Sequence, residues 1–98
     1  MYERNLYILV SHNHIMKAIQ ILEAFKSDIL EQVKEVKSSN EGILRREITI
    51  RVADIMYKYK CSDTIARRVL EMAEKVFRTE LGLNATYEKG ELKIVIEK

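Results

Sequence analysis

The sequence contains no proline, three glycines and a single cysteine, Cys61. One cysteine excludes an internal disulfide and a cysteine-rich zinc site, which agrees with a reducing compartment. Long apolar runs are also missing, because the longest, at residues 6–10, is far shorter than the roughly 20 residues of a membrane-spanning helix. Glu3 beside Arg4 interrupts the basic flank that is typical of a secretion signal. We therefore expect a cytoplasmic protein with no membrane partner.

The sequence also lacks the motifs that carry common catalytic chemistry. It has no glycine-rich phosphate loop, no nucleophile elbow and no paired-carboxylate arrangement. His12 and His14 are two positions apart, too close for the i,i+4 pair of a helical metal site, and no cysteine or carboxylate stands nearby in sequence. We therefore expect no enzymatic activity, no metal and no cofactor.

Charge is distributed unevenly along the 98 residues, although the net charge is only +2. Residues 1–42 carry five basic and six acidic groups, residues 43–68 carry seven and three, and residues 69–98 carry five and six. All the excess positive charge thus lies within residues 43–68. Local basic clustering of this kind is typical of a nucleic-acid contact.

The overall composition is that of a folded protein. The hydrophobic fraction is 47% and the charged fraction 33%, far from the signature of disorder. The length predicts a single domain over 1–98, with an N-terminal segment at 1–42 and a second part at 43–98. The charged residues are mostly Lys, Arg and Glu, a balance reported for proteins of hot-growing organisms.

Residues 13–37 have the spacing of a long amphipathic helix. Apolar side chains recur at steps of three and four, at Ile15, Ile19, Leu22, Phe25, Ile29, Val33 and Val36. Met16, Ala18, Ile21, Ala24 and Leu30 widen this stripe. An apolar stripe of this width predicts that the helix packs on its own domain along part of its length. Apolar surface of the helix that stays uncovered would then bind a second copy of the chain in a homodimer. For residues 6–10, a strand and an extra helical turn both stay open.

Two shorter helices are predicted in the second part of the chain. The first has apolar residues at Ile48, Val52, Ile55 or Met56, and Tyr59, with Thr49 as a candidate N-cap. The second starts at Ser62 or Asp63 and has apolar residues at Ile65, Val69, Met72 or Ala73, Val76 or Phe77, and Leu81. Gly82 is expected to close it in the left-handed conformation. About three residues between the two helices force a sharp turn, which predicts helix-turn-helix geometry.

A β-hairpin is predicted to follow these helices. Leu92, Ile94 and Ile96 alternate with Lys93, Val95 and Glu97, which is the period of a half-buried strand. Residues 85–88 lie opposite, and Lys89 and Gly90 supply the turn.

The stretches ITIRVADI at 48–55 and CSDTIARRVL at 61–70 resemble the winged helix-turn-helix family of DNA-binding domains, and the likeness spans 43–98. In that family an alanine of the first helix packs on the second, and a turn ending in serine leads into a recognition helix. The resemblance assigns these positions to Ala53 and Ser62, and the opening of the recognition helix to Thr64, Ile65, Arg67 and Arg68. The expected fold is mainly α with a C-terminal β-hairpin: a winged helix-turn-helix preceded by a long amphipathic helix.

The candidate DNA-binding site consists of residues from three elements, and most of these residues are basic. Arginines on the exposed side of the recognition helix can contact guanine edges, while lysines neutralise phosphate. The candidate residues are Arg45, Arg46, Arg51, Ser62, Thr64, Arg67, Arg68, Lys75, Arg78, Lys89 and Lys93. The alternative for the helix face is a solvated surface with i,i+4 pairs between Glu71 and Lys75 and between Glu74 and Arg78.

The function that we expect is sequence-specific binding to double-stranded DNA by a small transcriptional regulator, a homodimer held by the helix at 13–37. One alternative is a winged-helix protein-interaction module, with Glu71, Glu74 and Glu80 on the partner surface. Another is non-specific or single-strand binding, in which Tyr57 and Tyr59 would stack on bases.

Overall fold

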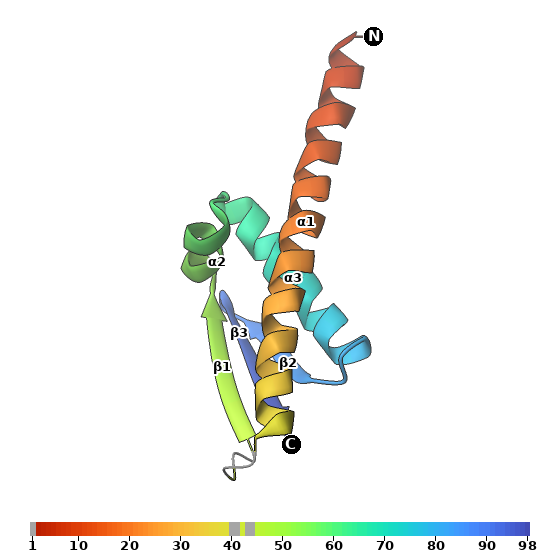
Figure 1. The fold of residues 1–98 in the computed structure, drawn as a ribbon. Coiled ribbons are helices and arrows are strands. Elements are labelled where there is room, and N and C mark those ends of the chain that lie inside the picture. The colour runs from red at the N-terminus through yellow and green to blue at the C-terminus, as the bar shows by residue number, and fades with distance from the viewer. Residues whose placement is uncertain (1, 40–41, 43–44) are drawn as a thin grey trace.

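The computed structural model describes residues 2–39, 42 and 45–98, with side chains from residue 16 onward. This part of the chain forms three helices and three strands, in the order α1 (Tyr2–Ser38), β1 (Arg45–Arg51), α2 (Val52–Tyr59), α3 (Asp63–Thr79), β2 (Asn84–Glu88) and β3 (Glu91–Glu97) (Figure 1). The expectation of a mainly helical fold with a C-terminal β-hairpin is confirmed.

Helix α1 is longer than the predicted helix at 13–37, and it includes the segment 6–10 that the sequence left open. Its 37 residues span about 55 Å at 1.5 Å per residue, so α1 sets the long dimension of a molecule measuring 61 × 22 × 21 Å. The N-terminal turns extend beyond the body (Figure 1). The rest of α1 packs on the body through buried residues that include Ala18, Leu22, Phe25 and Ile29.

Residues 45–51 form a strand, which corrects the expectation that a helix begins near Thr49. The sequence RREITIR alternates exposed and half-buried side chains, as a strand with one covered face does. The helical spacing was misread because β1 runs directly into α2, so that Ile48 belongs to the strand and Val52 to the helix. The N-cap of α2 is Arg51, whose backbone N–H donates to the Asp54 carboxylate at 2.8 Å.

The three strands form an antiparallel sheet in the order β1-β3-β2. The strand β3 is central, and its Leu92, Ile94 and Ile96 are fully buried beneath the helices. The alternation predicted for this hairpin is confirmed. The opposite face of the sheet is polar, with Thr49, Lys93 and Thr86 side by side across the three strands.

The connection between α2 and α3 consists of Lys60, Cys61 and Ser62. Lys60 has a left-handed backbone with φ of 51°, which ends α2, and its N–H donates to the Met56 carbonyl. Ser62 caps α3 by accepting a hydrogen bond from the Ile65 N–H at 3.3 Å. The sharp turn between two short helices that the sequence predicts is therefore present.

Two details of these helices differ from the sequence-based expectation. Ala53 is exposed, so it does not pack on α3; Val52 and Ile55 are the buried residues of α2. Helix α3 ends at Thr79 rather than at Leu81, although Gly82 has the expected left-handed backbone, with φ of 63°.

Helices α1 and α3 and the sheet share one core. Phe25 of α1 and Phe77 of α3 meet with ring centroids 5.2 Å apart, and the buried apolar residues form a single cluster. Val69, Leu70 and Ala73 of α3 are fully buried within it. Burial of this stripe fixes which side of α3 faces solvent.

Candidate nucleic-acid interface

Helix α3 displays a row of polar and basic side chains on the side opposite its buried stripe. The buried residues are Ile65, Ala66, Val69, Leu70, Ala73 and Phe77. The predicted face is exposed throughout and consists of Thr64, Arg67, Arg68, Glu71, Lys75 and Arg78. At 1.5 Å per residue, the 17 residues of α3 give this row a length of about 25 Å.

The basic residues of this row differ in their pairing. Arg67 forms an ion pair with Asp63 one turn earlier, at 2.6 Å between Nε and Oδ1, and the hydrogen bond to that carboxylate raises the pKa of Arg67. Within the described part of the chain, no carboxylate lies within 4.0 Å of Arg68, Lys75 or Arg78. These three cations are therefore available to a ligand.

The alternative of a solvated helix face predicts i,i+4 pairs between Glu71 and Lys75 and between Glu74 and Arg78, and neither pair is present among the described residues. The carboxylate of Glu74 instead accepts a hydrogen bond from the Tyr87 backbone N–H at 2.6 Å, which joins α3 to β2. The half-buried position of Glu74, turned toward the sheet, explains why it does not reach Arg78.

The turn of the β2–β3 hairpin lies beside the first half of α3. Gly90 accepts a hydrogen bond from the Val52 N–H at 3.2 Å, and a Cβ placed on Gly90 would be 4.0 Å from Nη1 of Arg67. Lys89, exposed and with a left-handed backbone, precedes Gly90 in this turn. The hairpin thus brings Lys89 to the same end of the molecule as Arg67.

Two further candidates lie on the polar face of the sheet. Arg51, at the end of β1, pairs with Glu91 at 3.3 Å, directly across from it in the sheet. Lys93 is exposed in β3 and borders an open recess of about 300 Å³ together with Thr86, Glu88, Lys89 and Glu91. Arg51 is paired with a carboxylate, and Lys93 shares its recess with two glutamates, so the sheet face is less basic than the row on α3.

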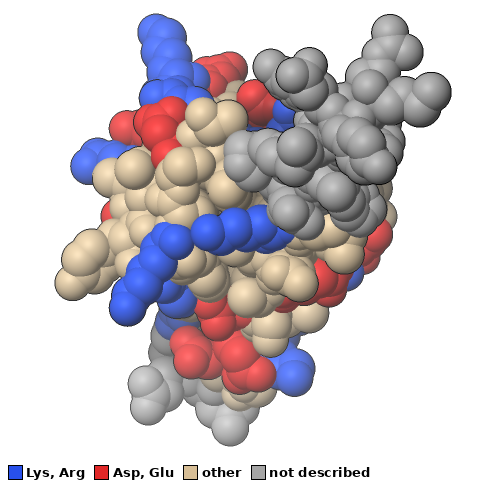
Figure 2. Space-filling model, turned by 90° about the horizontal axis from the view of Figure 1, so that it is seen from above, with Lys and Arg blue, Asp and Glu red and all other residues tan. Residues whose placement is uncertain are grey.

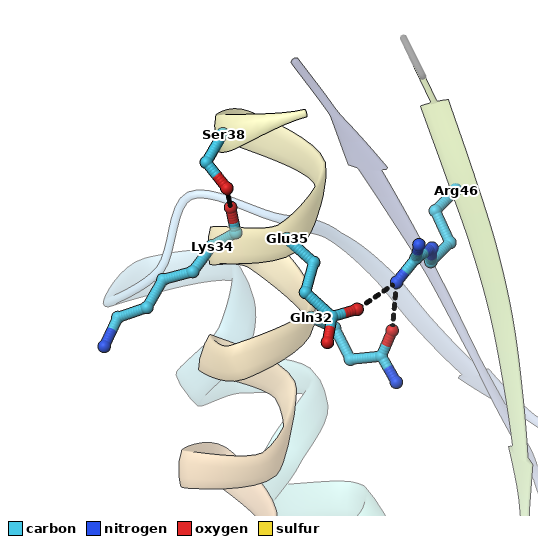
Figure 3. Close-up of polar contacts among 5 residues, drawn as sticks. All are labelled: Gln32, Lys34, Glu35, Ser38 and Arg46. Carbon is cyan, nitrogen blue, oxygen red and sulfur yellow. Dashed lines mark hydrogen bonds and ion pairs between the residues drawn. The ribbon is translucent and has the colours of Figure 1, made fainter. Parts of the chain in front are cut away.

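Arg45 and Arg46 lie apart from the other candidates. They begin β1, six and five residues before Arg51, and therefore about 17–20 Å from it along the strand. Figure 3 shows Arg46 reaching from β1 to α1, where it donates to Gln32 at 2.6 Å and to Glu35 at 2.9 Å. Arg45 pairs with Glu47 at 2.7 Å. The structure does not bring these two arginines to the face of α3.

Two charged residues that pair with site arginines were not predicted from the sequence. Asp63 stands four residues before Arg67, a spacing that predicts an ion pair on a helix. Glu91 pairs with Arg51 only because β1 and β3 are neighbours, and that pairing has no local signal in the sequence. Ser62 was predicted as a contact residue, and the structure shows its hydroxyl capping α3.

The face of the molecule that is seen from above carries both signs of charge. In the view along α1 from above, Lys and Arg side chains are interspersed with Asp and Glu over the described atoms (Figure 2). On this face, the described basic residues are therefore mixed with acidic ones.

Comparison of the chain with protein-family models, curated proteins and solved structures gave no match. Among the described residues, no helix combines the length and the apolar character needed to cross a membrane. The same residues contain no group of three or more His, Cys, Asp or Glu side chains that could hold a metal ion. The interpretation of the site therefore rests on its own geometry.

Proposed function

We propose that this protein binds double-stranded DNA, as a winged helix-turn-helix whose recognition helix is α3. The observation that carries the proposal is the exposed row on α3, which holds four cations and a single carboxylate, Glu71, between Thr64 and Arg78. The short turn before α3 and the hairpin turn beside it support the winged-helix assignment.

In this proposal, the first half of α3 contacts base edges. Arg68 has no ion pair to break, and Arg67 exchanges Asp63 for a DNA acceptor. An arginine in the major groove can donate two hydrogen bonds to guanine, which discriminates against other bases by about 1–3 kcal/mol. Lys75 and Arg78, further along the helix, neutralise phosphates, and Lys89 contacts the backbone from the hairpin turn.

We further propose that two copies bind together through α1, as a small cytoplasmic transcriptional regulator on a palindromic site. Much of the predicted stripe at 13–37 packs on the body, but Met16 is 42% exposed and Ile19 40% exposed. These residues stand next to the turns of α1 that extend beyond the body (Figure 1). In this proposal, the dimer contact includes Met16 and Ile19 of α1.

The two alternative functions have less support. Two of the three acidic residues invoked for a protein-interaction surface bind within the chain: Glu74 accepts from Tyr87, and Glu80 pairs with Lys26 at 2.6 Å. For single-strand binding, Tyr57 is open at 89% exposure, but the Tyr59 hydroxyl donates to Asp28 at 2.7 Å. Each alternative retains one free candidate residue.

Fluorescence anisotropy with random-sequence duplex DNA at two salt concentrations tests the proposal. We expect binding that weakens with salt and falls by about tenfold or more in Arg67→Ala/Arg68→Ala, because two contacts are lost. Arg45→Ala is the matched control, since it removes an exposed arginine at the far end of β1. Absence of binding at low salt, or an equal loss in the control, contradicts the proposal.

A further inference from the structure

A recess lies between α1, β1 and α2, away from the exposed face of α3. Its volume is 110 Å³, which is comparable with apolar cavities of about 150 Å³ that hold a benzene ring. Five apolar side chains line it: Phe25, Ile29, Ile48, Ile50 and Ile55. The other lining residues are polar: Asp28, Gln32, Asp54, Lys58 and Tyr59.

The recess exists because side chains of β1 on the helix-covered side of the sheet are incompletely covered. Ile48 and Ile50 are only half-buried, whereas their partners across the sheet, Ile94 and Leu92, are fully buried. Polar bridges hold α1 in place over β1 and α2: Asp28 accepts from Lys58 Nζ at 2.6 Å, and Gln32 accepts from Arg46. The apolar surface of Ile48 and Ile50 is thus partly open to solvent, next to polar side chains that include Asp28 and Gln32.

The charge of the recess is negative. It contains the carboxylates of Asp28 and Asp54 and one ammonium group, that of Lys58. Hydrogen bonds from Lys58 and Tyr59 lower the pKa of Asp28, so this carboxylate is ionised at neutral pH. An apolar site with net negative charge favours a cationic ligand.

Both carboxylates retain an oxygen that can accept further hydrogen bonds. Asp28 accepts from Lys58 and Tyr59 through Oδ2, and Asp54 accepts from the Arg51 N–H through Oδ2. No described residue donates a hydrogen bond to Oδ1 of either aspartate. A carboxylate has about four lone-pair sites, so a donor group of a ligand can be added without breaking the existing bonds.

We propose that this recess binds a small organic cation, an ammonium group carried on a short hydrocarbon chain. The chain covers Ile48, Ile50 and Ile55, and the ammonium group donates to the free oxygens of Asp28 and Asp54. A water takes up about 30 Å³ of liquid, so the recess has room for a ligand of at least about four non-hydrogen atoms. This inference goes beyond DNA binding and does not depend on it.

The test is a titration of the protein with n-butylammonium, followed by the amide resonances of the protein in NMR spectra. We expect saturable shifts of residues that line the recess, with a Kd on the order of 1 mM for so small a ligand. The neutral isostere 1-butanol should bind about tenfold more weakly, and butyrate should not saturate, because Asp28 and Asp54 repel its carboxylate.

Three variants locate the site. Asp54→Asn should weaken n-butylammonium binding at least about fivefold and keep the fold, since the amide oxygen of asparagine can still accept the hydrogen bond from the Arg51 N–H. Asp63→Asn is the matched control, because it removes a carboxylate outside the recess and should leave binding unchanged. Ile48→Phe fills the recess and should abolish binding.

Each outcome decides for or against the proposal. Absence of saturable shifts with n-butylammonium overturns it, as does equal binding of 1-butanol, which would indicate an apolar pocket without cation recognition. Equal weakening in Asp54→Asn and Asp63→Asn also overturns it, because the effect would then reflect net charge alone.

Discussion

Hydrogen bonds and ion pairs of a few side chains connect α1 to the rest of the molecule, in addition to its buried apolar residues. Asp28 accepts hydrogen bonds from Lys58 and Tyr59 of α2, Arg46 of β1 donates to α1, and Lys26 pairs with Glu80 after α3. These groups come from distant parts of the sequence. Each of these hydrogen bonds and ion pairs therefore depends on tertiary packing rather than on local structure.

We expect the Asp28→Asn variant to be less stable by about 1 kcal/mol at pH 7, since it weakens charge-assisted bonds that are partly exposed. The folded state holds the pKa of Asp28 below its usual 3.8. This stabilisation is therefore present above pH 3.8 and is lost as the pH falls through the lower pKa of the folded state.

Urea unfolding of the two proteins at pH 7 and at about pH 2 checks this expectation. The difference between wild type and Asp28→Asn should be present at pH 7 and vanish at acid pH. Glu31→Gln, at an exposed position of α1, serves as the control and should change little. A difference that is independent of pH would contradict the role given to the charge.

Lys60 adopts a left-handed backbone, with φ of 51°, which costs a residue with a Cβ about 1 kcal/mol. We expect Lys60→Gly to raise the free energy of unfolding by about that amount, because glycine carries no such penalty. Lys60→Ala keeps the Cβ and should give no gain. Thermal unfolding distinguishes the two variants, and an equal effect of both would show that the backbone conformation is not the cause.

At the scale of elements, α3 depends on its N-terminal cap as well as on its buried stripe. We expect Ser62→Ala to lower the free energy of unfolding by about 1 kcal/mol, because the Ile65 N–H loses its acceptor. Ser62→Asn retains a capping oxygen and should remain near wild type. Chemical denaturation is the measurement, and equal stability of all three proteins would argue against the cap.

The same variants bear on DNA binding. If the Ser62 hydroxyl acts only as a cap, Ser62→Asn should bind DNA with nearly the affinity of wild type. A large loss of affinity with unchanged stability would instead assign the hydroxyl a contact with DNA.

At the scale of the whole molecule, the dominant feature is the extension of α1 beyond the body (Figure 1). A helical segment of about 12–15 residues without tertiary contacts is only marginally stable in water. A second copy packed against this part of α1 would stabilise it, and two-fold pairing is the commonest form of self-association.

Sedimentation equilibrium tests this pairing. We expect a dimer whose dissociation constant rises by about tenfold or more in Ile19→Glu, because a charge enters the apolar contact. Gln20→Glu adds the same charge at a neighbouring exposed position and should have a smaller effect. A monomer at all concentrations, or equal effects of the two variants, would contradict dimerisation through this surface.

The sequence by itself determined that the chain forms a long N-terminal helix, two shorter helices and a C-terminal hairpin. Periods of 3.6 and 2 reflect which side chains must be buried in each element, and they are visible without knowing the neighbours. The exposed row on α3 followed from the same periodicity, since placing Val69 and Ala73 inward places Arg68 and Lys75 outward.

Only the tertiary structure decided the rest. The strand β1 was hidden because Ile48 fits the apolar spacing of α2, and the pairing of β1 with β3 joins residues 40 to 52 positions apart in sequence. The separation of Arg45 and Arg46 from α3 and the recess beside Asp28 also depend on how α1 lies over the sheet. The periodicity of the sequence shows which side chains are buried. The pairing of strands and the distances between side chains instead arise from packing among segments that are distant in sequence.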